Sequence, residues 1–532
     1  MPTIAKKQDK TKPSSKKSGA KLITVRDFLW LTGFGCLLGL SCPGINQWYL
    51  AWIGLAPLVL AISASKNVWQ AAARGLVFGL AYNLVYLNWY LGLQPLAWLG
   101  FNWWQGWMLA ASAWFICSFH QALIVAIFAL CARLIPMTGS FVPQKIPGGW
   151  KIPAVIMLPL LWVLIVNKIG NAPSFLGVPW SMLEYTQYKQ IPLIQIASII
   201  GGIGLGFIIV MVNTSIASLV STFSGKSLYK AITASNKRMA VVQTSIVLLI
   251  IPLCLALGQW QSAKTMIKAM TPVAVLQGNI NIEMQKTSHR YSLDELLERY
   301  IKLIPRIPPG MCIFTESAVP TYLSDNKEVQ NLLGQICKDR ELDMVVGAIG
   351  SDQEGNPYNS AYGISSAGKF LPNFYSKRYL VPFGEYAPTA VQYMPDWVKR
   401  LTNTPAGAGL SSGKQAEVLE LTRGNSAPLI CFECISPELA ADSTRNGGQL
   451  LVNISDLAWF HQSVIGEQMI AFSVFRAIEN RRFFVFAANT GPSAIINPSG
   501  MITERSALDD TTVMLGKVGF SSEITPFTTW FR

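Results

Sequence analysis

The sequence predicts a polytopic α-helical membrane region followed by an α/β domain. The 532 residues are 51% hydrophobic and have a mean hydropathy of +0.34, which is too apolar for an ordinary water-soluble protein. Between Phe28 and Gly258 there are eleven Lys or Arg residues and a single acid, Glu184. After about Thr271 the charge density is that of a soluble domain. The chain therefore divides into a membrane half and a globular half.

About seven stretches of the membrane half are candidate spans. A bilayer core needs roughly 17 to 25 mostly apolar residues per helix. The candidates lie at about 28–43, 48–64, 71–93, 106–134, 153–168, 192–222 and 240–258. We expect a transmembrane domain at 27–262, preceded by a disordered basic cytoplasmic tail, 1–26, and followed by a globular domain, 270–520, and a C-terminal tail, 521–532.

The basic residues predict the orientation of the spans. With a cytoplasmic N-terminus, seventeen Lys or Arg residues fall on the inner side, and only Lys168 and Lys189 fall on the outer side. An odd number of spans then places the globular domain on the outer side. The net charge of +14 is concentrated in the tail and the inner loops, so it indicates attraction to anionic lipid and no partnership with nucleic acid.

Short β-rich runs alternate with helical ones in the globular half, which indicates an α/β layered domain. Ser292 and Glu295 are spaced as a capping box at the start of the first expected helix. Strands are expected at 273–280, 311–316, 343–349, 359–366, 427–433, 449–455, 483–489 and 493–497, and helices at 292–304, 326–339 and 463–482.

Cys431 follows an apolar run and forms a C-x-x-C pair with Cys434. No second Cys or His pair follows at zinc-ligand spacing, which argues against a metal site. A disulfide between two residues three apart on an extended strand would be strained. A cysteine nucleophile needs a group that favours the thiolate and a group that moves its proton, and a lysine and a glutamate can supply both. Glu316 and Lys377 are the candidates for these two roles.

Three segments carry a resemblance to a known family. "FTESAVP" holds Glu316, "YSKRYLVPFGEYAP" holds Lys377 and Glu385, and "ICFECISPE" holds Cys431 and Glu433. In this order they resemble the glutamate, lysine and cysteine motifs of the nitrilase superfamily. A narrower resemblance is to the apolipoprotein N-acyltransferase family. It is carried by the segment "LVPFGEY", the preceding spans and the "VLQGNI" strand.

The resemblance implies an αββα sandwich on the periplasmic face of the bacterial inner membrane and a ping-pong acyl transfer. Cys431 would take an acyl chain from a phosphatidylethanolamine-like phospholipid and pass it to the amine of a diacylglyceryl-cysteine lipoprotein. Glu316 would be the general base and Lys377 the stabiliser of thiolate and oxyanion, supported by Glu385, Glu433 and Asn359. We expect a monomer that needs no cofactor and no metal.

The segment 391–401 combines Tyr393, Met394 and Trp397 with two basic residues. It fits a lid that dips into the membrane interface and equally an ordinary amphipathic surface helix.

The chain departs from the family pattern near the cysteine and after the following strand. Phe432 replaces a tyrosine, so any role of its hydroxyl is absent, and Asp456, Leu457 and His461 replace Asn, Asp and Gly in the stretch around Trp459. The family also often has an eighth span after the catalytic domain, whereas the sequence given stops at "TPFTTWFR". Two alternatives stay open: a membrane-anchored amidase or nitrile hydrolase acting on a small amide, and a scaffold that binds lipoproteins without catalysis.

Overall fold

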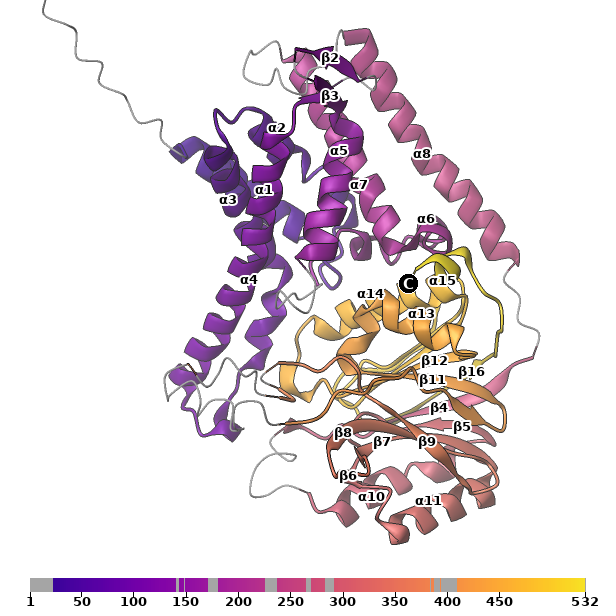
Figure 1. Ribbon diagram of the computed structural model, residues 1–532. Coiled ribbons are helices and arrows are strands. Elements are labelled where there is room, and N and C mark those ends of the chain that lie inside the picture. Colours follow the sequence, from indigo (N-terminus) through magenta and orange to yellow (C-terminus); the bar gives the residue numbers. More distant parts are fainter. Residues whose placement is uncertain are drawn as a thin grey trace, which may run out of the picture.

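The computed structural model places a helical region above an α/β domain (Figure 1). It describes residues 23–139, 143–147, 149–170, 180–224, 237–264, 269–282, 291–382, 384–386, 393 and 409–531. Residues 1–22, most of the predicted tail, lie outside the described residues.

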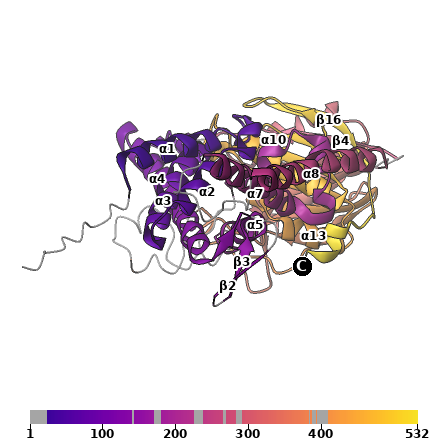
Figure 2. The ribbon, with the colours of Figure 1, turned by 90° about the horizontal axis from the view of Figure 1, so that it is seen from above.

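Every predicted span overlaps at least one helix of the structure. The helices are α1 (Val25–Gly39), α2 (Ala56–Ser63), α3 (Val68–Tyr86), α4 (Trp103–Leu134), α5 (Ala154–Leu161), α6 (Ile191–Ile194), α7 (Ala197–Phe223) and α8 (Lys237–Lys264). A π-helix, Trp162–Ile169, continues α5. Seen from above, α1 to α4 gather on one side, and α7 and α8 lie over the α/β domain (Figure 2).

Three of these helices are long and apolar enough to cross a membrane, within the part of the chain that the structure describes. They are α4, α7 and the segment Lys237–Gln259 of α8. The segments Trp48–Ser63 and Ala154–Ile169 are apolar but shorter. α1 has only 15 residues, and α3 contains the buried polar residues Arg74 and Asn83. The coarse prediction of a membrane-type helical region is therefore confirmed, whereas a count of seven spans is not established.

A kink divides α7 near its start. Gly201 has φ of 69° and ψ of 170°, which is non-helical and lies in the region that favours glycine. A Cβ atom at Gly201 would lie 2.8 Å from the ring of Phe527 in α15 (Pro526–Trp530). The kink thus allows the C-terminal helix to pack closely against α7.

Two mixed sheets form the α/β domain. The first has the order β16-β4-β5-β7-β8-β9, with β6 also paired to β7, and the second has the order β10-β11-β12-β13-β14-β15. The first comprises β4 (Thr271–Gln277), β5 (Gly310–Ile313), β6 (Val319–Tyr322), β7 (Leu342–Ser351), β8 (Pro357–Ile364), β9 (Phe370–Ser376) and β16 (Thr512–Val518). The second comprises β10 (Leu419–Leu421), β11 (Gly424–Ile430), β12 (Leu450–Ser455), β13 (Phe483–Ala488), β14 (Ala494–Ile496) and β15 (Ile502–Arg505). A small sheet in the helical region comprises β1 (Met137–Thr138), β2 (Gln144–Ile146) and β3 (Gly149–Pro153).

The two large sheets pack face to face between two helical layers (Figure 1). Val275 and Val345 from the first sheet meet Ile430 and Val452 from the second in one buried apolar cluster. Helices α10 (Leu293–Ile301) and α11 (Lys327–Arg340) cover the first sheet, and α13 (Pro437–Arg445) and α14 (Ile465–Asn480) cover the second. The outer face of α14 belongs to a core that continues into the helical region, so the two halves share one apolar interior.

The structure corrects the predicted strand at 427–433. β11 ends at Ile430, and Cys431–Ile435 forms a 3₁₀ turn. The prediction extended the strand because the apolar residues continue, but the backbone N–H of Ile430 donates a buried hydrogen bond to the Glu433 carboxylate where the strand ends. The argument against a disulfide assumed an extended strand at this point, so it does not hold; Cys431 and Cys434 are nevertheless both free thiols.

Candidate functional site

The three motif residues lie just beyond the ends of three strands. Glu316 follows β5, Lys377 follows β9 directly, and Cys431 follows β11 directly. Such strand ends are where layered α/β domains commonly build sites. Glu316 and Lys377 belong to the first sheet and Cys431 to the second, so the site forms where the two sheets face each other.

Glu316 is nearly buried and is held by three donors. Its Oε1 accepts hydrogen bonds from Asn359 Nδ2 at 2.7 Å and from Lys377 Nζ at 3.4 Å. Its Oε2 accepts one from the backbone N–H of Asp456 at 2.7 Å. The carboxylate is thereby fixed in one orientation.

Lys377 lies between two carboxylates. Its Nζ is 2.8 Å from Glu385 Oε1 and 3.4 Å from Glu316 Oε1, and its side chain is 1% exposed. Asn359 Nδ2 also donates to Glu385, at 2.9 Å. Burial by itself lowers the pKa of Lys377, but Glu385 and Glu316 outweigh it, so the pKa is raised and the ammonium stays charged.

Cys431 is partly exposed and adopts a left-handed backbone conformation with φ of 53°. Its carbonyl accepts a hydrogen bond from Asn453 Nδ2 at 3.0 Å. Burial of its sulfur is the largest cause that raises the thiol pKa; the charge of Glu316 raises it further and Lys377 lowers it. A hydrogen bond between the thiol and Glu316 also contributes to this rise. The resting thiol is therefore protonated and needs a base.

The pKa of Glu316 is also raised above its ordinary value. Burial is the largest cause, and Lys377 acts in the opposite direction, while Glu385 and Asp456 raise the pKa. A carboxylate whose pKa is shifted upward is a stronger base at neutral pH than an ordinary one. The arrangement thus supplies a base next to a thiol and a permanent cation next to both.

Glu433 shapes the turn that carries Cys431. Its Oε2 accepts hydrogen bonds from Ile430 N at 2.7 Å and from Tyr375 Oη at 2.8 Å. Its Oε1 accepts them from Arg378 N at 2.6 Å and from Tyr379 N at 3.0 Å. The fully buried carboxylate therefore ties the cysteine turn to the chain that follows Lys377.

The predicted lid is only partly within the described residues. Tyr393 is 85% exposed, in keeping with either interpretation of the segment. Met394 and Trp397 lie outside the described residues.

The residues that depart from the family pattern have defined contacts. Asp456 Oδ1 accepts hydrogen bonds from Ala458 N at 3.1 Å and Asn489 Nδ2 at 3.0 Å, so its side chain shapes the loop that holds Glu316. The rings of Trp459 and Trp98 meet edge to face at 5.1 Å, and His461 Nδ1 lies 2.9 Å from the Gly92 carbonyl. This loop therefore rests on the connection between α3 and α4.

The aromatic ring of Phe432, next to the cysteine, touches the helical region. It stacks on Tyr379 with ring centroids 5.3 Å apart and lies 5.7 Å from Trp180. Trp180 in turn contacts Trp89, 4.8 Å away. Cys431 thus lies one residue from an aromatic cluster that extends into the helical region.

Sequence reasoning missed Asn453, Tyr375 and the pair Arg476 and Glu479. Asn453 stood as one polar residue in the apolar run "LLVNIS", and Arg476 and Glu479 as two charges in the apolar helix "AFSVFRAIEN". A polar group inside an apolar run needs a buried partner, and that was the available signal. No group of three His, Cys, Asp or Glu residues in the described ranges is arranged to hold a metal ion.

Comparisons with known proteins agree with this architecture. Residues 34–215 match the apolipoprotein N-acyltransferase N-terminal domain, and residues 272–522 match the carbon-nitrogen hydrolase family. An apolipoprotein N-acyltransferase of Geobacter metallireducens is 32% identical over 509 residues, which cover 93% of this chain and 89% of the relative. One of Gloeobacter violaceus is 25% identical, over 90% of this chain and 86% of the relative.

Among solved structures, Saccharomyces cerevisiae Nit3, a member of branch 10 of the nitrilase superfamily, is 17% identical, covers 48% of this chain and 91% of its own, and has a TM-score of 0.35. The resemblance carried by the three motifs is confirmed by the sequence comparisons, because a relative more than 30% identical matches the chain through both its helical and its α/β region. This chain belongs to the apolipoprotein N-acyltransferase family, with an α/β domain of the carbon-nitrogen hydrolase type.

Proposed function

We propose that this acyltransferase moves a fatty acyl chain from a phosphatidylethanolamine-like phospholipid to the free amine of a diacylglyceryl-cysteine lipoprotein, through a thioester on Cys431. Glu316 is the base, Lys377 the cation, and Asn359, Glu385 and Glu433 hold them in place. The observation that carries the proposal is that buried Glu316 and Lys377 lie beside Cys431, one residue away from the aromatic contact between Phe432 and Trp180.

The position of the site suits a substrate that stays in the bilayer. Removing an acyl chain from lipid costs about 0.8 kcal/mol for each buried methylene, so the nucleophile must come to the membrane. Phe432, Trp180 and Trp89 form a continuous apolar path from the cysteine to helices of the membrane-type region. A water-soluble amide would gain nothing from this path.

The first step forms the acyl-enzyme. Glu316 accepts the thiol proton as the sulfur attacks the carbonyl carbon of the phospholipid ester, and the Lys377 ammonium stabilises the oxyanion. The carbon–oxygen bond of the ester then breaks, and the leaving oxygen takes the proton from Glu316. The products are the Cys431 thioester and a lysophospholipid.

The second step returns the enzyme to its starting state. The lipoprotein amine attacks the thioester carbon, Glu316 accepts a proton from the amine, the carbon–sulfur bond breaks, and the leaving Cys431 sulfur takes that proton from Glu316. The thioester conserves the activation of the acyl group, so this step depends on the amine and on exclusion of water.

The topology completes the proposal. Seven segments cross the inner membrane, the basic tail 1–26 is cytoplasmic, and the catalytic domain 270–520 faces the periplasm, with 521–532 as the C-terminal tail. The support is the excess of Lys and Arg in the connections assigned to the inner side.

The chemistry can be tested by mass spectrometry of the full chain in vesicles. With phosphatidylethanolamine, we expect Cys431 to gain the mass of one acyl chain, and a diacylated lipopeptide to remove it and become N-acylated. Release of free fatty acid alone would show that water and not the amine takes the acyl group, which would contradict the transferase, and absence of any adduct would contradict catalysis by Cys431.

The orientation can be tested in spheroplasts. The change Tyr393→Cys places a thiol at an exposed position of the α/β domain. A membrane-impermeant maleimide should label this variant when it is made in a Cys431→Ala background, but not Cys431→Ala alone, without lysis. Labelling that requires lysis would place the domain in the cytoplasm and overturn the topology.

A further inference from the structure

A buried ion pair lies between the cysteine turn and the helical region. Arg476 and Glu479 on α14 are both 0% exposed. Arg476 Nε donates to Glu479 Oε2 at 2.6 Å, and Arg476 Nη2 donates to Oε1 at 2.8 Å. Neither residue hydrogen-bonds to Glu316, Lys377 or Cys431, so the acyl-transfer steps above do not use the pair.

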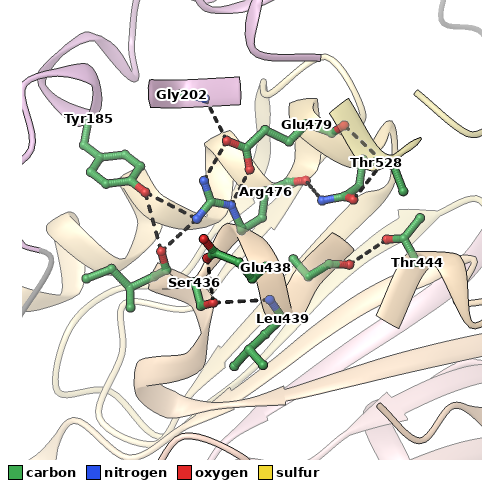
Figure 3. Close-up of polar contacts among 12 residues, drawn as sticks. Tyr185, Gly202, Ser436, Glu438, Leu439, Thr444, Arg476, Glu479 and Thr528 are labelled. Carbon is green, nitrogen blue, oxygen red and sulfur yellow. Dashed lines mark hydrogen bonds and ion pairs between the residues drawn. The ribbon is translucent and has the colours of Figure 1, made fainter. Parts of the chain in front are cut away.

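Arg476 reaches the far end of the cysteine turn. Its Nη1 donates to the carbonyl of Ile435 at 2.8 Å, and Ile435 is the last residue of the turn that Cys431 begins. The hydroxyl of Tyr185 in the helical region donates to the same carbonyl at 3.5 Å and accepts from Arg476 at 3.3 Å. Figure 3 shows the guanidinium of Arg476 between the Tyr185 hydroxyl and the Glu479 carboxylate.

Glu479 connects the same pair to α7. Its Oε1 accepts a hydrogen bond from the backbone N–H of Gly202 at 2.9 Å (Figure 3). Gly202 directly follows the kink at Gly201, where helical geometry resumes. N–H groups in the first turn of a helix have no partner within the helix, and a carboxylate is favoured there. One ion pair therefore joins a candidate membrane-spanning helix to the cysteine turn.

The turn needs external support because its first residue is strained. Cys431 has φ of 53°, and a non-glycine residue in this region costs on the order of 1–3 kcal/mol and persists only where its surroundings fix it. Asn453 holds the Cys431 carbonyl at the start of the turn, and Glu433 binds the backbone N–H of Ile430 just before it. Arg476 holds the end of the turn at Ile435.

We propose that Arg476 and Glu479 form a positioning unit that fixes the cysteine turn against α7 and so keeps the Cys431 sulfur beside Glu316 and Lys377. The unit acts through the backbone of Ile435 and touches no substrate. As a positioning role for the acyl transfer it rests on the proposed function, but its effect on the thiol is measurable without any lipid.

The decisive variant removes the charges while the site stays filled. Breaking a buried pair by removing one partner is strongly destabilising, whereas replacing both with neutral groups of similar size is often tolerated. The double change Arg476→Met with Glu479→Gln leaves an oxygen to accept from Gly202 and removes every Arg476 hydrogen bond, including the one to Ile435. If this variant does not fold, Arg476→Lys is measured in its place. Lysine keeps the charge but lacks the planar guanidinium that hydrogen-bonds to Ile435 and Glu479 at the same time.

Two rates are measured on the full chain in vesicles. We expect alkylation of Cys431 by iodoacetamide to slow by at least roughly tenfold, because the sulfur loses its alignment with Lys377. Thioester formation from phosphatidylethanolamine should slow by roughly 10²-fold in kcat with KM little changed, because misplacement of a reacting group costs about that much.

Arg481→Met is the matched control. Arg481 is a buried arginine at the end of α14 that also bridges to the helical region, donating to Gln195 Oε1 at 2.7 Å, but it does not bond to the cysteine turn. It should lower the melting temperature with little change in either rate.

Three results would overturn the proposal. They are unchanged alkylation in a folded double variant, rates lost equally in Arg481→Met, and rates that are lost when Arg476→Met is made alone but restored in the double variant. If iodoacetamide alkylates Cys431 of the wild type but phosphatidylethanolamine never acylates it, the proposed function is refuted. The positioning unit would then still be tested by the alkylation rates of the wild type and the variants.

Discussion

Lys377 and Glu385 form a buried ion pair in which Nζ and Oε1 are 2.8 Å apart, and Glu316 Oε1 lies 3.4 Å from the same ammonium. The three charges thus make a row of carboxylate, ammonium and carboxylate inside the α/β domain. Both carboxylates accept from one nitrogen of Asn359. This row determines how the reaction should respond to pH.

Glu385→Gln should move the acidic limb of the pH–rate profile to lower pH. A base works only when deprotonated, so the rate falls as the pH falls through the pKa of Glu316. The charge of Glu385 raises that pKa, so its removal lowers it. Single-turnover thioester formation measured across pH tests this, with the exposed Glu420→Gln as control. A shift to higher pH would contradict the assignment of Glu316 as the base.

Lys377→Met should reduce both rate and stability. Loss of an oxyanion-stabilising group costs roughly 10²–10³-fold in kcat, and loss of one partner from a buried ion pair costs about 3–5 kcal/mol. Thioester formation and thermal unfolding measure the two effects. A variant that keeps full activity would exclude Lys377 from the chemistry.

The stability loss in Lys377→Met should depend on pH. Without the ammonium, the pKa of Glu316 rises further above its ordinary value. The folded state then binds more protons than the unfolded state, so stability is retained at low pH and lost as the pH rises through the folded pKa. Melting temperatures compared at about pH 5 and about pH 8 should show the larger deficit at about pH 8. A larger deficit at the acidic pH would reverse the sign and disprove the coupling.

Cys431→Ala should abolish the acyl adduct, and the neighbouring Cys434→Ala should not. Cys434 is fully buried, and burial raises the pKa of its thiol to about 12, so it is a poor nucleophile. Intact-mass measurement after exposure to phosphatidylethanolamine separates the two variants. An adduct that survives Cys431→Ala would identify a different nucleophile.

Gly201→Ala should destabilise the protein by about 1–2 kcal/mol, because an L-residue is strained in the left-handed region. Its Cβ would also lie 2.8 Å from the Phe527 ring. Gly33→Ala in α1 is the control, since its Cβ would have no neighbour within 4 Å. Thermal melting in the same detergent compares them, and equal effects would show that the kink is not required.

Several elements of the α/β domain were predictable because their signals are local. The capping box of Ser292 and Glu295 marks the start of α10, and apolar runs locate β4, β7, β12 and β13. The strands β6, β9, β10, β15 and β16 and the helices α13 and α15 were missed. β16 gains its stability from pairing with β4, more than two hundred residues earlier in the chain. No local pattern of residues carries that information.

In the candidate site, too, some features were predictable from the sequence and others became visible only in the structure. The motifs pointed to Glu316, Lys377 and Cys431, and the structure brings these three together with Asn359, Glu385 and Glu433. The sequence did not predict that Asn453 donates a hydrogen bond to the carbonyl of Cys431, or that the strand ends at Ile430. Both depend on which buried polar groups meet after the sheets have packed.

The sequence alone determined the division into an apolar helical half and a charged α/β half, and it predicted which side chains would carry out acyl transfer. Both follow from composition and from residue type, which are properties of the chain before it folds. The tertiary structure alone decided that Arg476 reaches the cysteine turn and that Glu479 meets Gly202, 277 residues away along the chain. Such contacts form only because burial leaves polar groups no water, so each must find its partner within the folded protein.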